Sequence, residues 1–504
     1  MFNRKTSVGR GEKKGTVRNS FSSIAFDEKR KRLGRDRTMR ENDSRNGQGE
    51  VAIEYTSKPV SGWGGLAVLM RYFDRLGVRE HLEQGLPDGR TSPNQVGVVD
   101  MAMQLMATIL TGGSRFSHVG RIAADPVMMT MLGAERLGDP MTLTRYFGGF
   151  VQSQSEHLQK TLQTLVTQRL ISHRTDDVLD LDSTVFTRCG EQEGAERGYN
   201  PSRRGRRSHH PLLAMLAESK CILHNWLRSG NASTLRGAKE FYLEVIGCLP
   251  VGFSIRALRA DSGFCSTEFF DTLEAHSTPY TIAMKMSKPV QRWSAALPEW
   301  TCIQQGLEVA EGMYQPHYWE APRRVVVIRK QVRRQVKDVL FEIVDWEYHA
   351  MVTTLSVPAI EVWRFYNGRG DCENRIKELK YDFNGDGFCL QSFNGTEAVF
   401  RLNCFLFNLV SDFKRIVLQD MTLTLSTIRS KVFVIGVLLG SRGRTKVLRL
   451  GLTNRWKELF AALLDRVRAL TTSTVAHLRK LLETKVLDAS SPWRLRRVNH
   501  PLAA

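Results

Sequence analysis

Acidic residues in three separate parts of the chain have the type and setting that metal-assisted phosphoryl transfer requires. Asp180 and Asp182 lie in a run of β-branched and apolar residues at 178–185 that predicts a strand. Because side chains alternate along a strand, both carboxylates share one face, where burial is costly unless they are solvated, paired or bound to a metal. Asp261 ends a second predicted strand at 254–261. Such acids can hold Mg²⁺, which prefers oxygen ligands, but an aspartate at a strand end is also typical of a turn or a helix cap.

The third acid, Glu373, lies in a charged segment at 363–380. Tyr366, Glu373 and Lys380 are seven residues apart, so on one helix they form a stripe. Arg369 lies about a sixth of a turn aside. In this arrangement Glu373 can ligate a metal while the cations and the phenol hold phosphate oxygens. The pattern also fits a solvated helix with i,i+4 ion pairs, and nearby glycines leave open that Tyr366 and Arg369 belong to a turn before the helix.

The overall charge favours a polyanionic partner. The 504 residues include 72 Lys and Arg against 52 Asp and Glu, a formal net charge of +20, which favours nucleic acid over a membrane surface. A loop at 188–208 is rich in glycine and arginine, and its arginines can contact phosphates without reading base sequence; a merely solvated basic loop is the alternative. These arginines are Arg203, Arg204, Arg206 and Arg207.

Composition excludes several other classes of protein. Hydrophobic residues make up 42% and charged residues 25% of the chain, as in ordinary soluble domains rather than disordered or fibrous chains. We expect no membrane span, because no apolar run approaches the ~20 residues that one needs. The N-terminus lacks a secretory signal, so we expect a cytoplasmic protein. The eight cysteines occur singly, so we expect reduced thiols and no structural metal.

The order of predicted elements indicates how these residues are held. Helical periodicity dominates the first third of the chain after a basic start, and it returns from residue 360. Further strand-like runs occur at 281–286, 324–329 and 339–344, and 212–216 is either a strand or a helix start. The predicted segments are a basic disordered arm (1–55), a helical DNA-binding domain (56–175), strands that hold Asp182 and Asp261 (176–284), a β-rich region (285–346), the segment with the Glu373 helix (347–420) and a helical C-terminal region (421–504).

The spacing in the charged segment resembles the Y-R-E-K signature of a large branch of DDE-type bacterial insertion-sequence transposases: Tyr366, two residues, Arg369, three, Glu373, six, Lys380. Leu181-Asp182-Ser183-Thr184 is similar to the first-aspartate strand of that family, and Arg259-Ala260-Asp261-Ser262-Gly263-Phe264 to its second-aspartate motif. Other motifs resemble the insertion sequence 1380 family, and the resemblance covers roughly 56–470. These motifs are Gly198-Tyr199-Asn200-Pro201 with His210-Pro211-Leu212, residues 59–66 ending in Gly64-Gly65-Leu66, and residues 401–409.

This resemblance implies an α/β RNase H-like catalytic core, interrupted by a β-rich insertion domain at 285–346 and flanked by N-terminal and C-terminal helical regions. It implies that Asp182, Asp261 and Glu373 are the catalytic acids and bind two Mg²⁺ ions, which Mn²⁺ can replace. Asp180 is the rival of Asp182, because both point the same way. Cys372 departs from the family pattern at a position where a small residue is expected. The residues implied to position the DNA backbone are Tyr366, Arg369 and Lys380.

The activity implied by the resemblance is that of a transposase. Two metal ions would activate water, or a DNA 3′-hydroxyl, for in-line attack on the scissile phosphate and would stabilise the leaving oxygen. The implied partners are transposon ends and target DNA, bound by a homodimer in a synaptic complex at the bacterial nucleoid. Two alternatives stay open: an RNase H-like nuclease without strand transfer, and a DNA-binding protein that has lost catalysis.

Overall fold

The computed structural model describes residues 41–43, 51–88, 92, 94–171, 174–335 and 342–470. The chain divides into two compact units, residues 1–57 and 58–504. In the first unit, β1 (Glu41–Asp43) and β2 (Val51–Ile53) pair in an antiparallel hairpin. This hairpin is a local departure from the disorder that we predict for the basic arm; most of that arm lies outside the described residues.

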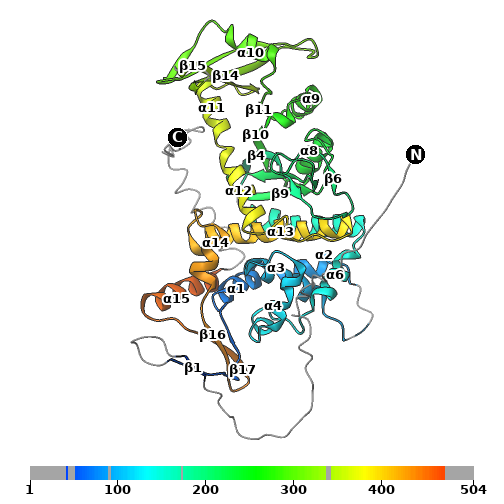
Figure 1. Ribbon diagram of the computed structural model, residues 1–504, viewed down its shortest axis with the longest axis vertical. Helices are drawn as coiled ribbons and strands as arrows, with labels where there is room; N and C mark the ends of the chain where they lie inside the picture. The colour runs from blue at the N-terminus through cyan, green and yellow to red at the C-terminus, as the bar shows by residue number, and fades with distance from the viewer. Residues whose placement is uncertain are drawn as a thin grey trace, which may run out of the picture. The chain divides into compact units, whose positions relative to one another are not determined.

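A mixed sheet forms the centre of the second unit (Figure 1). Among the described residues it has nine strands in the order β12-β13-β14-β15-β11-β10-β4-β8-β9. The neighbours β4, β10 and β11 run parallel, and the other pairs are antiparallel. The strands are β4 (Asp176–Ser183), β8 (Leu212–Leu216), β9 (Cys221–Trp226), β10 (Ser254–Ala260), β11 (Tyr280–Ala283), β12 (Thr301–Gln304), β13 (Leu307–Tyr314), β14 (Arg323–Gln335) and β15 (Glu342–Thr353).

The predicted strands agree with this sheet. The runs at 178–185 and 254–261 correspond to β4 and β10, and those at 281–286 and 324–329 overlap β11 and β14. The segment 212–216, left open between strand and helix, is the wholly buried strand β8. Of the run at 339–344, only 342–344 are described, and they begin β15. Because β15 pairs with β11, strands β12 to β15 continue the central sheet.

Helices before the sheet form the predicted helical region. Between them and the sheet lies α13 (Phe393–Phe413), which contacts α7, α3 and the edge strand β9 (Figure 1). Every residue of α13 from Gly395 to Phe413 is buried, as expected for a helix in the centre of a large core. No helix within the described ranges is both long and apolar enough to span a bilayer. The N-terminal helices are α1 (Leu66–Leu76), α2 (Val78–Gly85), α3 (Val98–Leu110), α4 (Val119–Ala124), α5 (Met128–Met131), α6 (Pro140–Gly148) and α7 (Gln152–Leu165).

The prediction of a helical C-terminal region at 421–504 is wrong over residues 437–450. Helices α14 (Leu425–Ile428) and α15 (Asn454–Ala469) are present, but β16 (Val437–Arg442) and β17 (Thr445–Leu450) form an antiparallel hairpin between them. Gly443, with φ of +60°, opens the two-residue turn, a position that favours glycine because its φ is positive. Residues 471–504 lie outside the described part of the chain.

The glycine pair Gly64-Gly65 packs against the segment that leads into β16. Strand β3 (Val60–Ser61) pairs with β16, and the amide of Gly64 donates to the carbonyl of Ile435 at 2.8 Å. A Cβ added to Gly65 would lie 1.7 Å from the carbonyl oxygen of Val432, so the two backbones can approach only because a side chain is missing.

We therefore expect Gly65→Ala to lower the free energy of unfolding by about 2–3 kcal/mol or more, because a backbone clash forces the two segments apart. Gly62→Ala is the matched control, since a Cβ at Gly62 would meet nothing within 4 Å. Urea-induced unfolding of both variants checks this prediction. Equal stabilities of the two variants would contradict it.

Candidate active site

Two neighbouring strand ends bring Asp182 and Asp261 together. Strands β4 and β10 run parallel with Leu181 opposite Ala260, so the next position along each strand is Asp182 on β4 and Asp261 just after β10. Adjacent strands lie about 4.8 Å apart. Each carboxylate is oriented by a backbone amide: Asp182 Oδ1 accepts from Ser183 at 2.7 Å, and Asp261 Oδ1 accepts from Gly263 at 2.9 Å.

The charged segment forms two helices instead of one. Tyr366 lies near the end of α11 (Ala359–Asn367), whereas Glu373 and Lys380 lie on α12 (Gly370–Tyr381). Arg369 is the residue before α12. The four residues are therefore not on one continuous helix, and the break at Gly368 agrees with the weakening by glycine noted in the sequence.

Arg369 joins the first and third acids. Its Nη2 lies 2.9 Å from Asp182 Oδ2, and its Nη1 lies 2.6 Å from Glu373 Oε1. The residue is buried, and its Nε atom has no hydrogen-bond partner among the described residues. Burial by itself lowers the pKa of Arg369, but the nearby carboxylates of Asp182 and Asp261 raise it by a larger amount. Its pKa is therefore higher than that of a free arginine, and the side chain stays charged. One guanidinium thus links acids that are 191 residues apart in the sequence (373 − 182).

The site is rich in negative charge that is only partly compensated. Burial raises the pKa of Asp182 to about 7; Arg369 opposes this rise, and the nearby carboxylates of Asp261 and Glu373 add to it. Burial also raises the pKa of Tyr366, with Arg369 again opposing and Asp261 adding to the rise. These interactions place Asp261 within electrostatic range of both residues, so Asp182, Asp261, Glu373, Arg369 and Tyr366 form one cluster.

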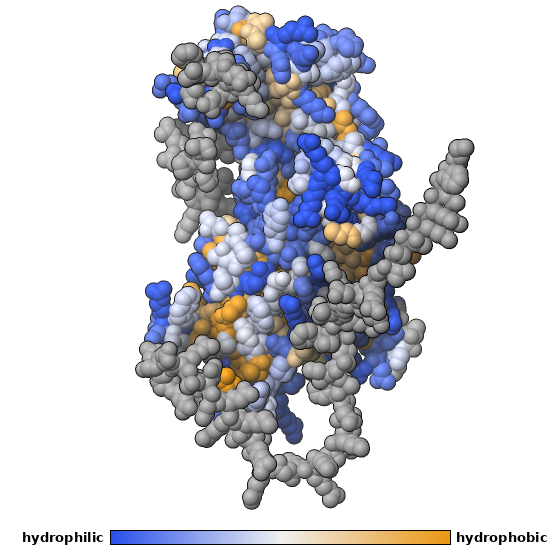
Figure 2. All heavy atoms as spheres, in the orientation of Figure 1, coloured by the Kyte–Doolittle hydropathy of each residue, from blue (hydrophilic) through white to orange (hydrophobic). Residues whose placement is uncertain are grey.

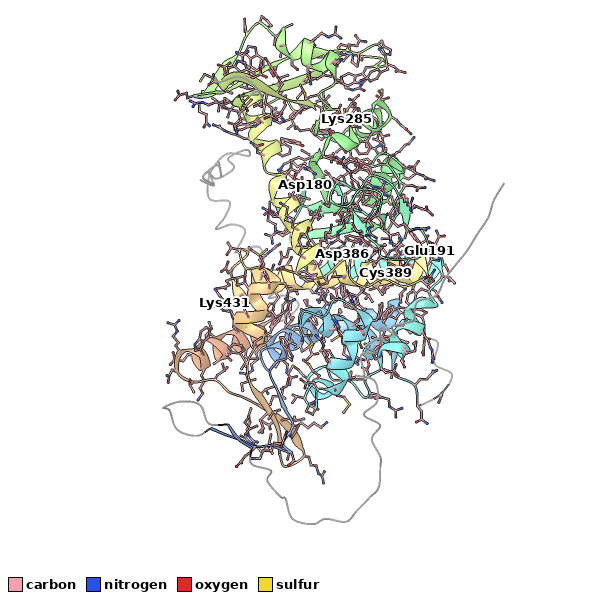
Figure 3. All side chains as sticks on the ribbon, in the orientation of Figure 1. Asp180, Glu191, Lys285, Asp386, Cys389 and Lys431 are labelled. Carbon is pink, nitrogen blue, oxygen red and sulfur yellow. The ribbon has the colours of Figure 1, made fainter. Side chains whose placement is uncertain are left out.

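Asp180, the rival of Asp182, has a different environment. It lies on β4 beside α12 (Figure 3), where both of its oxygens accept from Arg259: Nε to Oδ1 at 2.6 Å and Nη2 to Oδ2 at 2.7 Å. Asp180 is 1% exposed and Arg259 is 4% exposed. Each oxygen of Asp180 thus accepts a charge-assisted hydrogen bond from the same guanidinium, which favours Asp182 over Asp180 as the acid available to a ligand.

Lys380 and the arginine loop lie near each other. Lys380 Nζ donates to the Val185 carbonyl at 2.8 Å. Burial lowers the pKa of Lys380, with Asp386 opposing and Arg203 adding to the shift, so Arg203 lies within electrostatic range of α12. The loop runs between β6 (Glu196–Arg197) and β7 (Arg207–His209) of a small separate sheet. Of its arginines, Arg207 is half-buried near Glu191, and the exposed ones are Arg203, Arg204 and Arg206.

The sequence analysis did not predict a functional role for three residues near the cluster. Arg259 pairs with Asp180. Arg259 precedes Asp261 by two residues, as Asp180 precedes Asp182, and this equal spacing could have predicted the pair. His210 is buried, and its Nδ1 lies 2.8 Å from the Ala232 carbonyl. Burial lowers the pKa of His210, the Ala232 carbonyl and Asp261 oppose the shift, and Arg228 adds to it. Gly368 lies against Arg259, a contact that no local pattern indicates.

The donor types fit Mg²⁺, although the acids are not gathered into a ready ligand set. Among the described residues, no three Asp, Glu, His or Cys side chains form a group that could hold a metal ion as arranged. The guanidinium of Arg369 supplies the positive charge between Asp182 and Glu373. All three acids nevertheless offer the carboxylate oxygens that Mg²⁺ prefers. Burial, with smaller contributions from Asp261 and Glu373, raises the pKa of Asp182 and so disfavours its charged form, which a bound cation would stabilise.

The second unit is a mixed α/β fold with a large central sheet, and acids lie at two neighbouring strand ends. Residues 44–472 match the family model described as Transposase DDE domain group 1, so the chain belongs to that family. The predicted resemblance to DDE transposases is thereby confirmed. No curated protein matches the chain. The chain is also similar to a solved structure, the cryo-EM structure of piggyBac transposase synaptic complex with hairpin DNA, with 10% identity and a TM-score of 0.38 over 87% of this chain and 89% of that one.

Proposed function

We propose that this chain cleaves DNA at the terminal inverted repeats of its own element and joins the ends to target DNA, with Asp182, Asp261 and Glu373 as the metal-binding catalytic acids. The observation that carries the proposal is the cluster itself. Asp182 on β4 and Glu373 on α12 both pair with Arg369, and Asp261 after β10 lies within electrostatic range of it. Membership of the DDE transposase family supports the same reaction class.

Two bound Mg²⁺ ions would supply activation of the attacking oxygen and stabilisation of the leaving oxygen. The chain's own residues orient the acids and bind the strand. The amides of Ser183 and Gly263 fix the carboxylates of Asp182 and Asp261. The phenol of Tyr366, whose pKa is raised by burial, stays protonated and can donate to a phosphate oxygen. We further propose that Arg369 and Lys380 contact the DNA backbone in exchange for their present contacts with the Asp182 and Glu373 carboxylates and with the Val185 carbonyl.

The DNA path that we propose follows the basic loop. Arg203, Arg204 and Arg206 are exposed, and hydrophilic side chains cover most of the face drawn in Figure 2 over the central sheet. These exposed arginines, of which Arg203 lies within electrostatic range of Lys380 on α12, would bind phosphates without reading base sequence, with Arg207 at the base of the loop. The net charge of +20 supports a nucleic-acid partner.

Several finer assignments belong to the same proposal. We assign the chain to the insertion sequence 1380 branch with its Y-R-E-K signature, and β4, β8, β9, β10 and β11 with α12 to an RNase H-like core. Strands β12 to β15 fall between Asp261 and Glu373, where we place the insertion domain. We further propose a homodimer that pairs two transposon ends in the bacterial cytoplasm, because joining both ends requires holding them together.

The test uses the full chain and a duplex that carries the terminal sequence flanking its gene. With Mg²⁺ or Mn²⁺ we expect cleavage at the repeat end and products joined to a target plasmid; with EDTA we expect neither. Cleavage without joined products would identify the nuclease alternative. Binding without cleavage in either metal would identify a DNA-binding protein that has lost catalysis, and both outcomes would overturn the proposed transposition.

A further inference from the structure

A buried ion pair lies two residues before the proposed catalytic acids on the same two strands. Asp180 and Arg259 face each other across β4 and β10, and their two hydrogen bonds measure 2.6 and 2.7 Å. Each residue precedes a proposed catalytic acid by two positions, Asp182 on one strand and Asp261 after the other. Because side chains alternate, the pair and the acids share one face of the sheet.

Arg259 makes a third contact, to the helix break that precedes Glu373. Its Nη1 donates to the carbonyl of Phe365 at 2.8 Å, and its guanidinium lies 5.1 Å from the centre of the Phe365 ring. Phe365 is in the last turn of α11, and its carbonyl also accepts from the Gly368 amide at 3.2 Å. A cation is favourable at this end of a helix. One guanidinium therefore binds both strand β4, through Asp180, and the end of α11.

Gly368 makes this contact sterically possible. A Cβ added to Gly368 would lie 2.3 Å from Arg259 Nη1, well inside van der Waals contact. By comparison, a Cβ added to Gly370, two residues later, would meet nothing within 4 Å. A side chain at Gly368 would therefore displace the Arg259 guanidinium from this position, whereas a side chain at Gly370 would meet nothing.

We propose that Asp180 and Arg259 are positioning residues that hold the junction of α11 and α12 against the strand ends, and thereby place Arg369 and Glu373 beside Asp182 and Asp261. The inference rests on the proposed function, since it assigns a purpose to the same site. A buried ion pair gives little net stability compared with apolar residues of similar volume. We therefore infer that this pair acts through geometry, because the rigid guanidinium of Arg259 binds β4 and α11 at the same time.

The experiment compares two pairs of variants of the full chain. Gly368→Ala is matched with Gly370→Ala. Arg259→Lys is matched with Arg401→Lys, because Arg401 forms another buried pair, with Glu397 at 2.9 Å on α13. A lysine keeps the charge but cannot bind Asp180 through a fork while also reaching Phe365. The measurements are hydrogen exchange of peptides covering 359–381 and Mn²⁺ affinity from the signal of the free ion in electron paramagnetic resonance.

We expect Gly368→Ala and Arg259→Lys to speed exchange in 359–381 by roughly tenfold or more and to weaken Mn²⁺ binding by a similar factor. The two control variants should leave both quantities near wild type, even where Arg401→Lys lowers the melting temperature. Unchanged exchange in 359–381 for both test variants would overturn the positioning role. Absence of Mn²⁺ binding by the wild type would instead count against the proposed function, while the exchange data would still decide whether the pair holds the junction.

Discussion

Replacing Asp182 or Asp261 by Asn, or Glu373 by Gln, will lower the rate of Mg²⁺-dependent DNA cleavage by about 10³-fold or more. Each change removes one anionic oxygen from a site that must hold dications, and the amide cannot replace it. The measurement is single-turnover cleavage of end DNA in Mg²⁺ by each variant at equal protein concentration. Because the three acids act on the same ions, combining two substitutions should cost little more than either alone.

Acids on the same elements provide matched controls for this result. Asp176 begins β4 and pairs with Arg256 near the surface, and Glu361 on α11 pairs with the exposed Arg364. Asp176→Asn and Glu361→Gln should cleave within a few-fold of wild type. Cleavage at wild-type rates by any one of the three site variants would remove that acid from the proposed site, and cleavage by all three would refute the assignment.

The second large effect is on stability: Asp182→Asn will make the fold more stable than wild type at pH 8 in metal-free buffer. Burial and nearby acids raise the pKa of Asp182 in the folded chain to about 7, from 3.8 for the unperturbed group. The folded state then binds more protons than the unfolded state between these values, so wild-type stability falls as pH rises from about 4 to about 7. The amide has no charge to lose, so the difference can reach about 4 kcal/mol above pH 7.

Urea-induced unfolding of wild type and Asp182→Asn at several pH values, in EDTA, measures this difference. The gain of the variant should be absent near pH 4, grow through pH 7 and stay constant above it. Asp176→Asn, which removes a partly exposed carboxyl from the same strand, is the matched control. A stability difference that does not depend on pH would contradict a raised pKa for Asp182.

The strands of the site could be predicted because their own residues specify them. β4 combines apolar residues with aspartates in phase, and β10 is a largely apolar run that Asp261 follows. Alternation alone therefore predicts Asp180 and Asp182 on one face. The choice between these two depended on cross-strand register, which sets Arg259 opposite Asp180. Register is decided by the whole sheet and by turns elsewhere. The family motif ranked the two aspartates, and the equal spacing of Arg259 from Asp261 and of Asp180 from Asp182 was a further signal.

Other features were beyond local patterns for different reasons. The hairpin at 437–450 was missed because its apolar positions also suit a helix, although the Gly443 turn was a signal in favour of strands. The break between α11 and α12 could be suspected from two glycines, but its contact with Arg259 is a tertiary one. The catalytic roles of Asp182, Asp261 and Glu373 stay predictions, and so do the segment boundaries proposed from the sequence.

The pairing of β3 with β16 has a consequence for biosynthesis. Strand β3 (residues 60–61) pairs with residues 437–438 of β16. This pairing can form only after the ribosome has translated most of the second unit. Asp182, Asp261 and Glu373 are all synthesised before the residues of β16. Final closure is therefore a late, long-range event, and the folding of this chain is expected to be largely post-translational.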